Sequence, residues 1–164
     1  MTSEGSDLVV VHDDVCADLV APLTNAILAR ATEHPRPAPS LNVGGWKSGE
    51  TFFGWPLPAV AELYRTISRA YMSDRTLVGW AMVNADGSHH PRHRHDGSAT
   101  SGVYYVCAGG PPLAPTIFEV PGVGEVCVEP RPARLVLFPG WLWHRVPACG
   151  GRPPRITVAF DARR

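Results

Sequence analysis

The second half of the chain is a succession of short segments, separated by Gly and Pro, that carry the two-residue alternation of β-strands. Eight such segments lie at residues 76–84, 91–96, 101–107, 115–119, 125–129, 134–138, 142–146 and 155–160. Many short strands at regular spacing are typical of β-sandwiches and barrels. The pattern therefore predicts a mainly β protein, with N-terminal supporting helices and a jelly-roll-like double-stranded β-helix as its core.

The clearest helix is expected before these strands, at residues 58–72. It begins with a proline and has apolar residues at the spacing of one buried stripe, namely Val60, Leu63, Ile67 and Tyr71. A second helical segment is expected from Asp13 and Asp14, as candidate caps, to Leu28. Within it, Pro22 is placed at the first position of a new helix, because proline breaks a helix interior.

The length of the chain, 164 residues and 17.7 kDa, is that of one ordinary domain. A chain of this size can bury roughly two-thirds of its unfolded surface without disulfides. We expect a single domain, 1–164, in which residues 1–75 provide helical support and connectors. Residues 76–164 are expected to form the double-stranded β-helix with the functional site. Short strands are also expected at residues 8–11, as a sheet edge, and within residues 42–53.

The composition argues against several classes of function. Acidic and basic side chains balance at 15 each, without a basic cluster, so neither nucleic acid nor an acidic membrane surface is an expected partner. No run of about 18 apolar residues predicts a membrane span. The four cysteines are scattered, and no secretion signal begins the chain, which predicts reduced thiols and a cytoplasmic protein.

Histidines concentrate at the start of the β region. His89, His90, His93 and His95 lie close together, and His144 follows much later in the chain. If His93 and His95 share a strand, its two-residue period directs both rings to one face. His144 is the candidate for a third ligand from a distant strand. Such a facial set leaves the opposite coordination positions open, as in non-heme Fe(II) sites that bind substrate and dioxygen.

The segment at 155–160 carries an arginine in an otherwise apolar strand pattern. Arg155, Thr157 and Ala159 share one face of it. A buried arginine is costly unless it meets an anion, and its planar fork suits a carboxylate, which the Thr157 hydroxyl could also bind. The pattern predicts a carboxylate site, with an ion pair between Arg155 and an acidic side chain of the protein as the alternative.

As a set, these motifs resemble the 2-oxoglutarate/Fe(II)-dependent oxygenase superfamily, and more narrowly a family of small oxygenases. The resemblance covers residues 41–160 and is carried by GGWKS (44–48), the W-x-x-x-N of Trp80 to Asn84, HRHDGSATSGVYYV (93–106), FPGWLWHRV (138–146) and RITVAF (155–160).

The resemblance implies Fe(II) as the metal, with His93, His95 and His144 as its ligands. It also implies 2-oxoglutarate as co-substrate, bound by Arg155 with Thr157, and by two further candidates, Tyr105 and Asn84. The implied reaction uses dioxygen to oxidise, most simply to hydroxylate, a small substrate that is free or carrier-bound.

One position departs from the usual His-x-Asp or His-x-Glu pattern of the superfamily, because His95 takes the place of the carboxylate and Asp96 follows it. Three neutral imidazoles leave Fe(II) with its full charge. An alternative is therefore a cupin-type three-histidine dioxygenase or isomerase that does not use 2-oxoglutarate. A third class is a non-enzymatic metal-binding or sugar-binding sandwich, whose closed site could take His89 and His90 as extra ligands.

Overall fold

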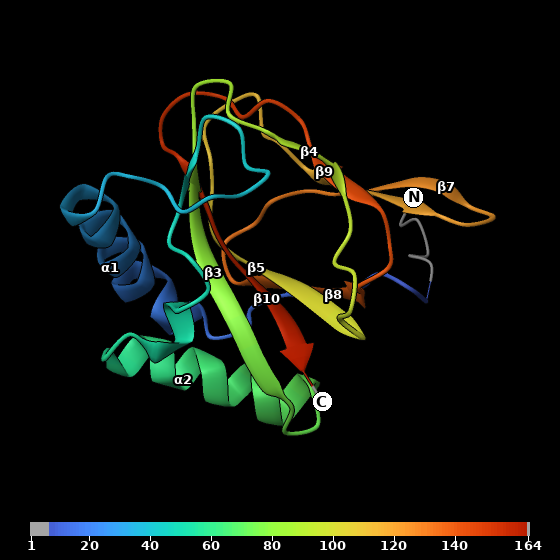
Figure 1. The fold of residues 1–164 in the computed structure, drawn as a ribbon, viewed down its shortest axis with the longest axis horizontal. Coiled ribbons are helices and arrows are strands. Elements are labelled where there is room, and N and C mark those ends of the chain that lie inside the picture. The colour runs from blue at the N-terminus through green and yellow to red at the C-terminus, as the bar shows by residue number, and fades with distance from the viewer. Residues whose placement is uncertain (1–6, 164) are drawn as a thin grey trace.

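The computed structural model describes residues 7–163; residues 1–6 and 164, at the ends of the expected domain, lie outside the described part. Figure 1 shows two β-sheets, with helices covering the outer face of one of them. The helical elements are the 3₁₀ helices η1 (Ala17–Leu19) and η2 (Phe52–Gly54), the α-helices α1 (Val20–Glu33) and α2 (Pro58–Thr66), and the π-helical turn η3 (Ile67–Tyr71).

The larger sheet has six strands in the order β1-β8-β5-β10-β3-β2, and the smaller has four in the order β4-β9-β6-β7. The larger sheet consists of β1 (Val10–His12), β2 (Trp46–Lys47), β3 (Thr76–Asn84), β5 (Thr100–Ala108), β8 (Arg134–Pro139) and β10 (Arg155–Arg163). The smaller consists of β4 (His90–His93), β6 (Thr116–Val120), β7 (Gly124–Val128) and β9 (His144–Val146). Neighbouring strands pair antiparallel throughout, which confirms the predicted double-stranded β-helix.

Two apolar layers hold this arrangement together. The outer layer lies between the larger sheet and the helices, and includes Leu23, Ile27, Val60, Leu63, Ile67, Tyr104, Ile156, Val158 and Phe160. The inner layer lies between the sheets, and includes Trp80, Met82, Val103, Tyr105, Phe118, Phe138 and Ala159. Strand β10 serves both layers, because alternate residues point to opposite faces of the sheet. Its inward face therefore carries Arg155 and Thr157 as well as Ala159.

Among the strands expected after residue 75, three ends differ from the predicted ones by two residues or more. Strand β4 ends at His93 instead of continuing to residue 96, and β9 begins at His144 instead of residue 142. Strand β10 continues beyond residue 160 to Arg163. The reason is strand pairing. The partner of β4 is β9, which has only three residues, whereas both partners of β10, strands β3 and β5, have nine residues each.

The N-terminal helix also differs in detail from the prediction. Pro22 is the third residue of α1, where the first-turn N–H groups have no intrahelical acceptor and a proline costs no hydrogen bond. Asp13 caps no helix and pairs instead with Arg134, at 2.7 Å. The predicted helix at 58–72 is confirmed, with Pro58 at its first position and η3 continuing it. No helix within residues 7–163 combines the length and apolarity needed to cross a bilayer.

The close approach of β5 and β10 generates a stability prediction. Gly102 pairs with Phe160, and a Cβ added at Gly102 would lie 2.2 Å from the Phe160 ring. Gly102→Ala must displace this buried ring, and overpacking of this kind typically costs about 1–3 kcal/mol. We expect a lower urea midpoint of unfolding. Gly54→Ala is the control, because its Cβ would meet nothing within 4 Å; equal midpoints for both variants would contradict the packing argument.

Candidate metal centre

Three histidines converge at one end of the space between the sheets. His93 ends β4 and pairs in register with His144, the first residue of β9. His95 follows in the loop after β4, where its backbone N–H donates to the Gly140 carbonyl oxygen at 2.8 Å. One ligand atom from each of the three rings lies within 4.8 Å of the other two, so the group could hold a metal ion.

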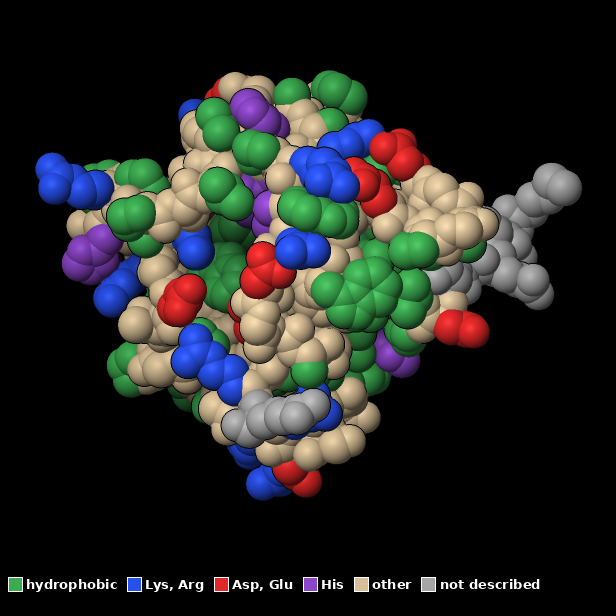
Figure 2. Space-filling model, turned by 45° about the vertical axis from the view of Figure 1, so that its right-hand side comes forward, with side chains coloured by type: hydrophobic (Ala, Val, Ile, Leu, Met, Phe, Trp, Pro, Cys, Tyr) green, Lys and Arg blue, Asp and Glu red, His purple; other side chains and the backbone are tan. Residues whose placement is uncertain are grey.

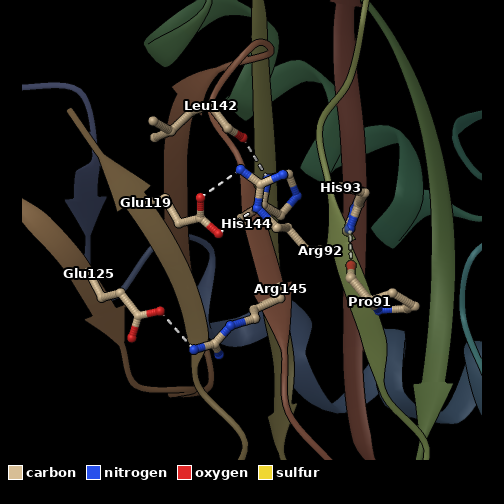
Figure 3. Close-up of polar contacts among 8 residues, drawn as sticks. All are labelled: Pro91, Arg92, His93, Glu119, Glu125, Leu142, His144 and Arg145. Atoms are coloured by element: carbon tan, nitrogen blue, oxygen red, sulfur yellow. Dashed lines mark hydrogen bonds and ion pairs between the residues drawn. The ribbon is translucent and has the colours of Figure 1, made fainter.

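Each of these rings has its Nδ1 atom directed at an oxygen that can only accept a hydrogen bond. The acceptors for His93, His144 and His95 are the carbonyl oxygens of Pro91 (2.8 Å) and Leu142 (2.9 Å) and a carboxylate oxygen of Asp161 (2.6 Å). Figure 3 shows the first two. Because Nδ1 must carry the proton to donate it, the lone pair of each ring is on Nε2. The three Nε2 atoms are thus the available metal ligands.

The prediction that His93 and His95 lie on one strand is wrong, because β4 ends between them. Their rings nevertheless stack, with centroids 5.5 Å apart and planes at 22°. Asp96 does not replace His95, since its carboxylate pairs with Arg94 at 2.8 Å and its side chain is 74% exposed. Within residues 7–163, the metal-competent group contains the three histidines and no carboxylate.

Asp161 is the residue at this site that the sequence analysis missed. It lies on the inward face of β10, beyond the point where that strand was expected to end. Burial raises its pKa, but the hydrogen bonds from His95 and from the Ser101 hydroxyl (2.6 Å) outweigh burial and hold the pKa below its ordinary value. Asp161 is therefore ionised at neutral pH. Continuing the inward alternation past Ala159 by two positions would have found it.

A small cavity extends from the histidines toward Arg155. Its apolar walls are Trp80, Met82, Val103 and Val146, and its far end is lined by Thr116, Arg155 and Thr157. Its free volume of about 30 Å³ has room for one or two water molecules, so a larger ligand requires lining side chains to move outward. Figure 2 shows this face of the molecule hollowed, with apolar side chains in the floor of the hollow and histidine beside it.

Arg155 is 4% exposed and makes hydrogen bonds only to neutral groups. Its Nε donates to the Ala114 carbonyl oxygen and its Nη2 to the Thr116 hydroxyl, both at 3.1 Å. No carboxylate within residues 7–163 forms an ion pair with it, so the expected alternative of an internal ion pair is wrong for the described chain. A buried guanidinium without an anion is costly, which indicates that an anionic ligand belongs beside it.

The hydroxyl of Thr157 supports the same conclusion. Thr157 is fully buried, lines the same cavity, and its Oγ1 has no hydrogen-bond partner among the described residues. Buried polar groups are nearly always hydrogen-bonded, so an unpartnered one implies a missing partner. An unpaired guanidinium and an orphaned hydroxyl two residues apart fit one carboxylate group, as 2-oxoglutarate would supply.

Tyr105 and Asn84, the two further candidates for co-substrate binding, do not line the cavity. The Tyr105 hydroxyl shares a 2.6 Å hydrogen bond with Thr116, and the Tyr105 ring centre lies 5.1 Å from the Arg155 guanidinium carbon. Tyr105 therefore supports the arginine end of the cavity without lining it. Asn84 also does not line the cavity; its Nδ2 donates to Asn42 (2.6 Å) and Ser88 (3.2 Å). The structure thus gives Asn84 a part in joining β3 to neighbouring loops, and its contact with the co-substrate stays a prediction.

Larger cavities exist elsewhere. One lies between α1, residues 34–39 and β2, one between α1 and residues 51–57, and one between α1 and α2. Their volumes are about 370, 650 and 510 Å³. None is lined by any of the three clustered histidines, by Arg155 or by Thr157. The chemistry of the lining residues, and not the cavity size, therefore identifies the candidate site.

Comparison with known proteins agrees with this chemistry. Residues 120–161 match the family model described as "Putative 2OG-Fe(II) oxygenase", a segment that includes His144, Arg155, Thr157 and Asp161. The chain is therefore similar to this family over 42 of its 164 residues. No curated protein matches the chain in sequence. The three-histidine group is consistent with Fe(II).

Solved structures of low sequence identity share the fold. A prolyl-4-hydroxylase of Pseudomonas putida has a TM-score of 0.73 at 20% identity, over 96% of this chain and 92% of that one. A prolyl hydroxylase of Trichoplax adhaerens, in complex with a hypoxia inducible factor peptide fragment, has a TM-score of 0.78 at 10% identity, over 96% and 84%. A viral collagen prolyl hydroxylase from Paramecium Bursaria Chlorella virus-1, in complex with 2-oxoglutarate, has 0.68 at 11%, over 99% of both. These similarities establish the double-stranded β-helix fold.

Burial of the histidines generates a prediction for the metal-free protein. Burial, reinforced by neighbouring positive charge, lowers the pKa of His90 and of His144 from 6.5 to about 3, and burial also lowers the pKa of His93. As pH falls below 6.5, the unfolded chain binds protons that the folded chain does not, so stability is lost. We expect a lower urea midpoint at pH 5 than at pH 7.5, and a smaller difference in His90→Asn. Equal midpoints in the wild-type protein would contradict the burial argument.

Proposed function

We propose that the protein binds Fe(II) through the Nε2 atoms of His93, His95 and His144 and binds 2-oxoglutarate through Arg155 and Thr157. It would use dioxygen to hydroxylate a small substrate, free or carrier-bound. The main support is the buried, unpaired guanidinium of Arg155 in the cavity that the three histidines also line. A closed structural metal site has no use for an anion pocket beside it.

The chemistry of the side chains suggests the role of each residue in the proposed reaction. When bound, the metal and the oxo acid supply the redox chemistry: dioxygen hydroxylates the substrate C–H bond while the oxo acid is converted to succinate and carbon dioxide. His93, His95 and His144 would hold the metal, and a three-residue ligand set would leave coordination positions for the other reactants. Arg155 and Thr157 orient the oxo acid by its distal carboxylate. Trp80, among the apolar walls, limits access of water.

Arg155→Leu tests the co-substrate assignment. Leaving a buried carboxylate without its partner typically costs about 2–5 kcal/mol, which raises a dissociation constant by roughly 30- to 4,000-fold. We expect this loss of 2-oxoglutarate affinity in the anaerobic Fe(II) protein, with iron binding unchanged. Calorimetric titration measures both. His144→Ala should lose iron binding in the same assay.

Two further variants distinguish an effect on 2-oxoglutarate binding from an effect on protein stability. Arg145→Leu removes a cation next to His144, but this arginine pairs with Glu125 at 2.8 Å and should not affect 2-oxoglutarate (Figure 3). Thr157→Val replaces the orphaned hydroxyl with a methyl group, and should weaken 2-oxoglutarate binding without lowering the stability of the ligand-free protein. If Arg155→Leu binds the oxo acid as the wild type does, while iron still binds, a cupin-type activity becomes the better proposal.

The charges near the cavity suggest the class of substrate. Arg92, Arg94 and Arg145, which lie near the metal ligands in sequence, are each paired with a carboxylate, at 2.7, 2.8 and 2.8 Å. Lys47, the only lysine, forms no ion pair within residues 7–163, and its Nζ lies 4.6 Å from the centre of the Trp80 ring. Its charge also lowers the pKa of His93. We propose that Lys47 binds an acidic group of the substrate.

Because Lys47 is the only lysine, isotope-labelled lysine gives a single side-chain NMR signal that reports on this site. Several structural neighbours are named prolyl hydroxylases, so N-acetylproline and N-acetylprolinamide form a suitable first pair of probes. We expect the acid to shift the Lys47 signal in the protein loaded with Zn(II) and 2-oxoglutarate, and the amide to shift it less. Lys47→Met should remove the preference of succinate formation for the acid. The same response to acid and amide would contradict the assignment.

A further inference from the structure

The second ligand position, where this chain lacks the usual carboxylate, has a carboxylate directly behind it. His95 donates its Nδ1 proton to Asp161 at 2.6 Å, across a separation of 66 residues. The other two histidines donate to backbone carbonyl oxygens, so only His95 has a charged partner. The unusual ligand and a half-buried anion therefore meet at the same ring.

We infer that Asp161 is a positioning residue of the metal centre, which supplies through His95 the negative charge that a carboxylate ligand usually supplies directly. The inference rests on the proposed metal site. A carboxylate that accepts the Nδ1–H proton fixes the ring orientation and strengthens Nε2 as a donor. With Asp161 counted, Fe(II) and three neutral imidazoles carry the same net charge as Fe(II) with two histidines and one carboxylate ligand.

The position of Asp161 is determined by the sheet. In β10 it pairs with Ser101 of β5 on one side and with Val78 of β3 on the other. The Ser101 hydroxyl donates to the same carboxylate oxygen, at 2.6 Å, and the Asp161 side chain is only 26% exposed. The Trp80 ring lies 5.7 Å from the His95 ring. A carboxylate held in this way is hydrogen-bonded directly to one imidazole, unlike a solvated surface charge.

Asp161→Asn and Asp96→Asn form a matched pair of variants. Both remove one negative charge near His95, but Asp96 is largely exposed and pairs with Arg94. Loss of a carboxylate behind a ligating histidine typically weakens metal binding about 10- to 100-fold. We expect such a loss of Co(II) and Fe(II) affinity, with shifted Co(II) visible bands, in Asp161→Asn only. Thermal unfolding of the metal-free variants shows whether each is folded.

A second pair of variants distinguishes charge supply from structural support. In a His95→Asp background the usual carboxylate ligand is restored and supplies the negative charge directly. Asp161→Asn should then lower metal affinity far less than it does in the wild-type background. A purely structural role predicts the same loss in both backgrounds.

The outcomes separate this inference from the proposed function. Wild-type affinity and Co(II) bands in Asp161→Asn, or equal losses in both backgrounds, would overturn the role of Asp161 and leave the metal site intact. If His95→Asp does not fold, the Co(II) bands and affinities of the two single variants decide. If the wild-type protein and His144→Ala bind metal equally, the proposed site itself is overturned.

Discussion

Strand β10 is hydrogen-bonded to β3 on one side and to β5 on the other, and the rest of the site depends on this double pairing. A strand held along both edges cannot slip by one residue without exchanging its two faces. One face is apolar and packs under the helices, through Ile156, Val158, Phe160 and Ala162. Because burial of this face determines the register, it also determines that Arg155, Thr157 and Asp161 point to the other side, toward the space between the sheets.

The site is defined by polar groups that the protein alone does not satisfy. Arg155 is a buried cation with neutral acceptors, and the buried hydroxyl of Thr157 has no partner in the described part of the chain. The histidine rings, by contrast, are satisfied at Nδ1 and free at Nε2. Groups of this kind reduce stability unless a ligand completes them. Their concentration in one cavity, together with the family match, supports the proposal that a metal and a carboxylate-bearing co-substrate complete the site.

Local sequence patterns predicted most of the secondary structure, because Gly, Pro and alternation mark strand ends and faces. Strand β3 has the predicted bounds, and Pro58 begins the predicted helix. The predictions that were wrong concern residues whose pairing partners lie far away in the sequence. Strand β4 ends early because its neighbour β9 is short, and Asp13 turns from the helix to Arg134. Pairing of this kind depends on sheet order, which no local window contains.

From the sequence alone, alternation placed Arg155 and Thr157 on one face of a strand, and the clustered histidines were predicted to bind a metal together with His144. Three features came only from the folded chain: among residues 7–163, Arg155 has no acidic partner and the Thr157 hydroxyl has no hydrogen-bond partner, and Asp161 lies behind His95. The physical reason is that alternation follows from local backbone geometry. Burial and hydrogen-bond partners arise only when the two sheets bring distant segments together.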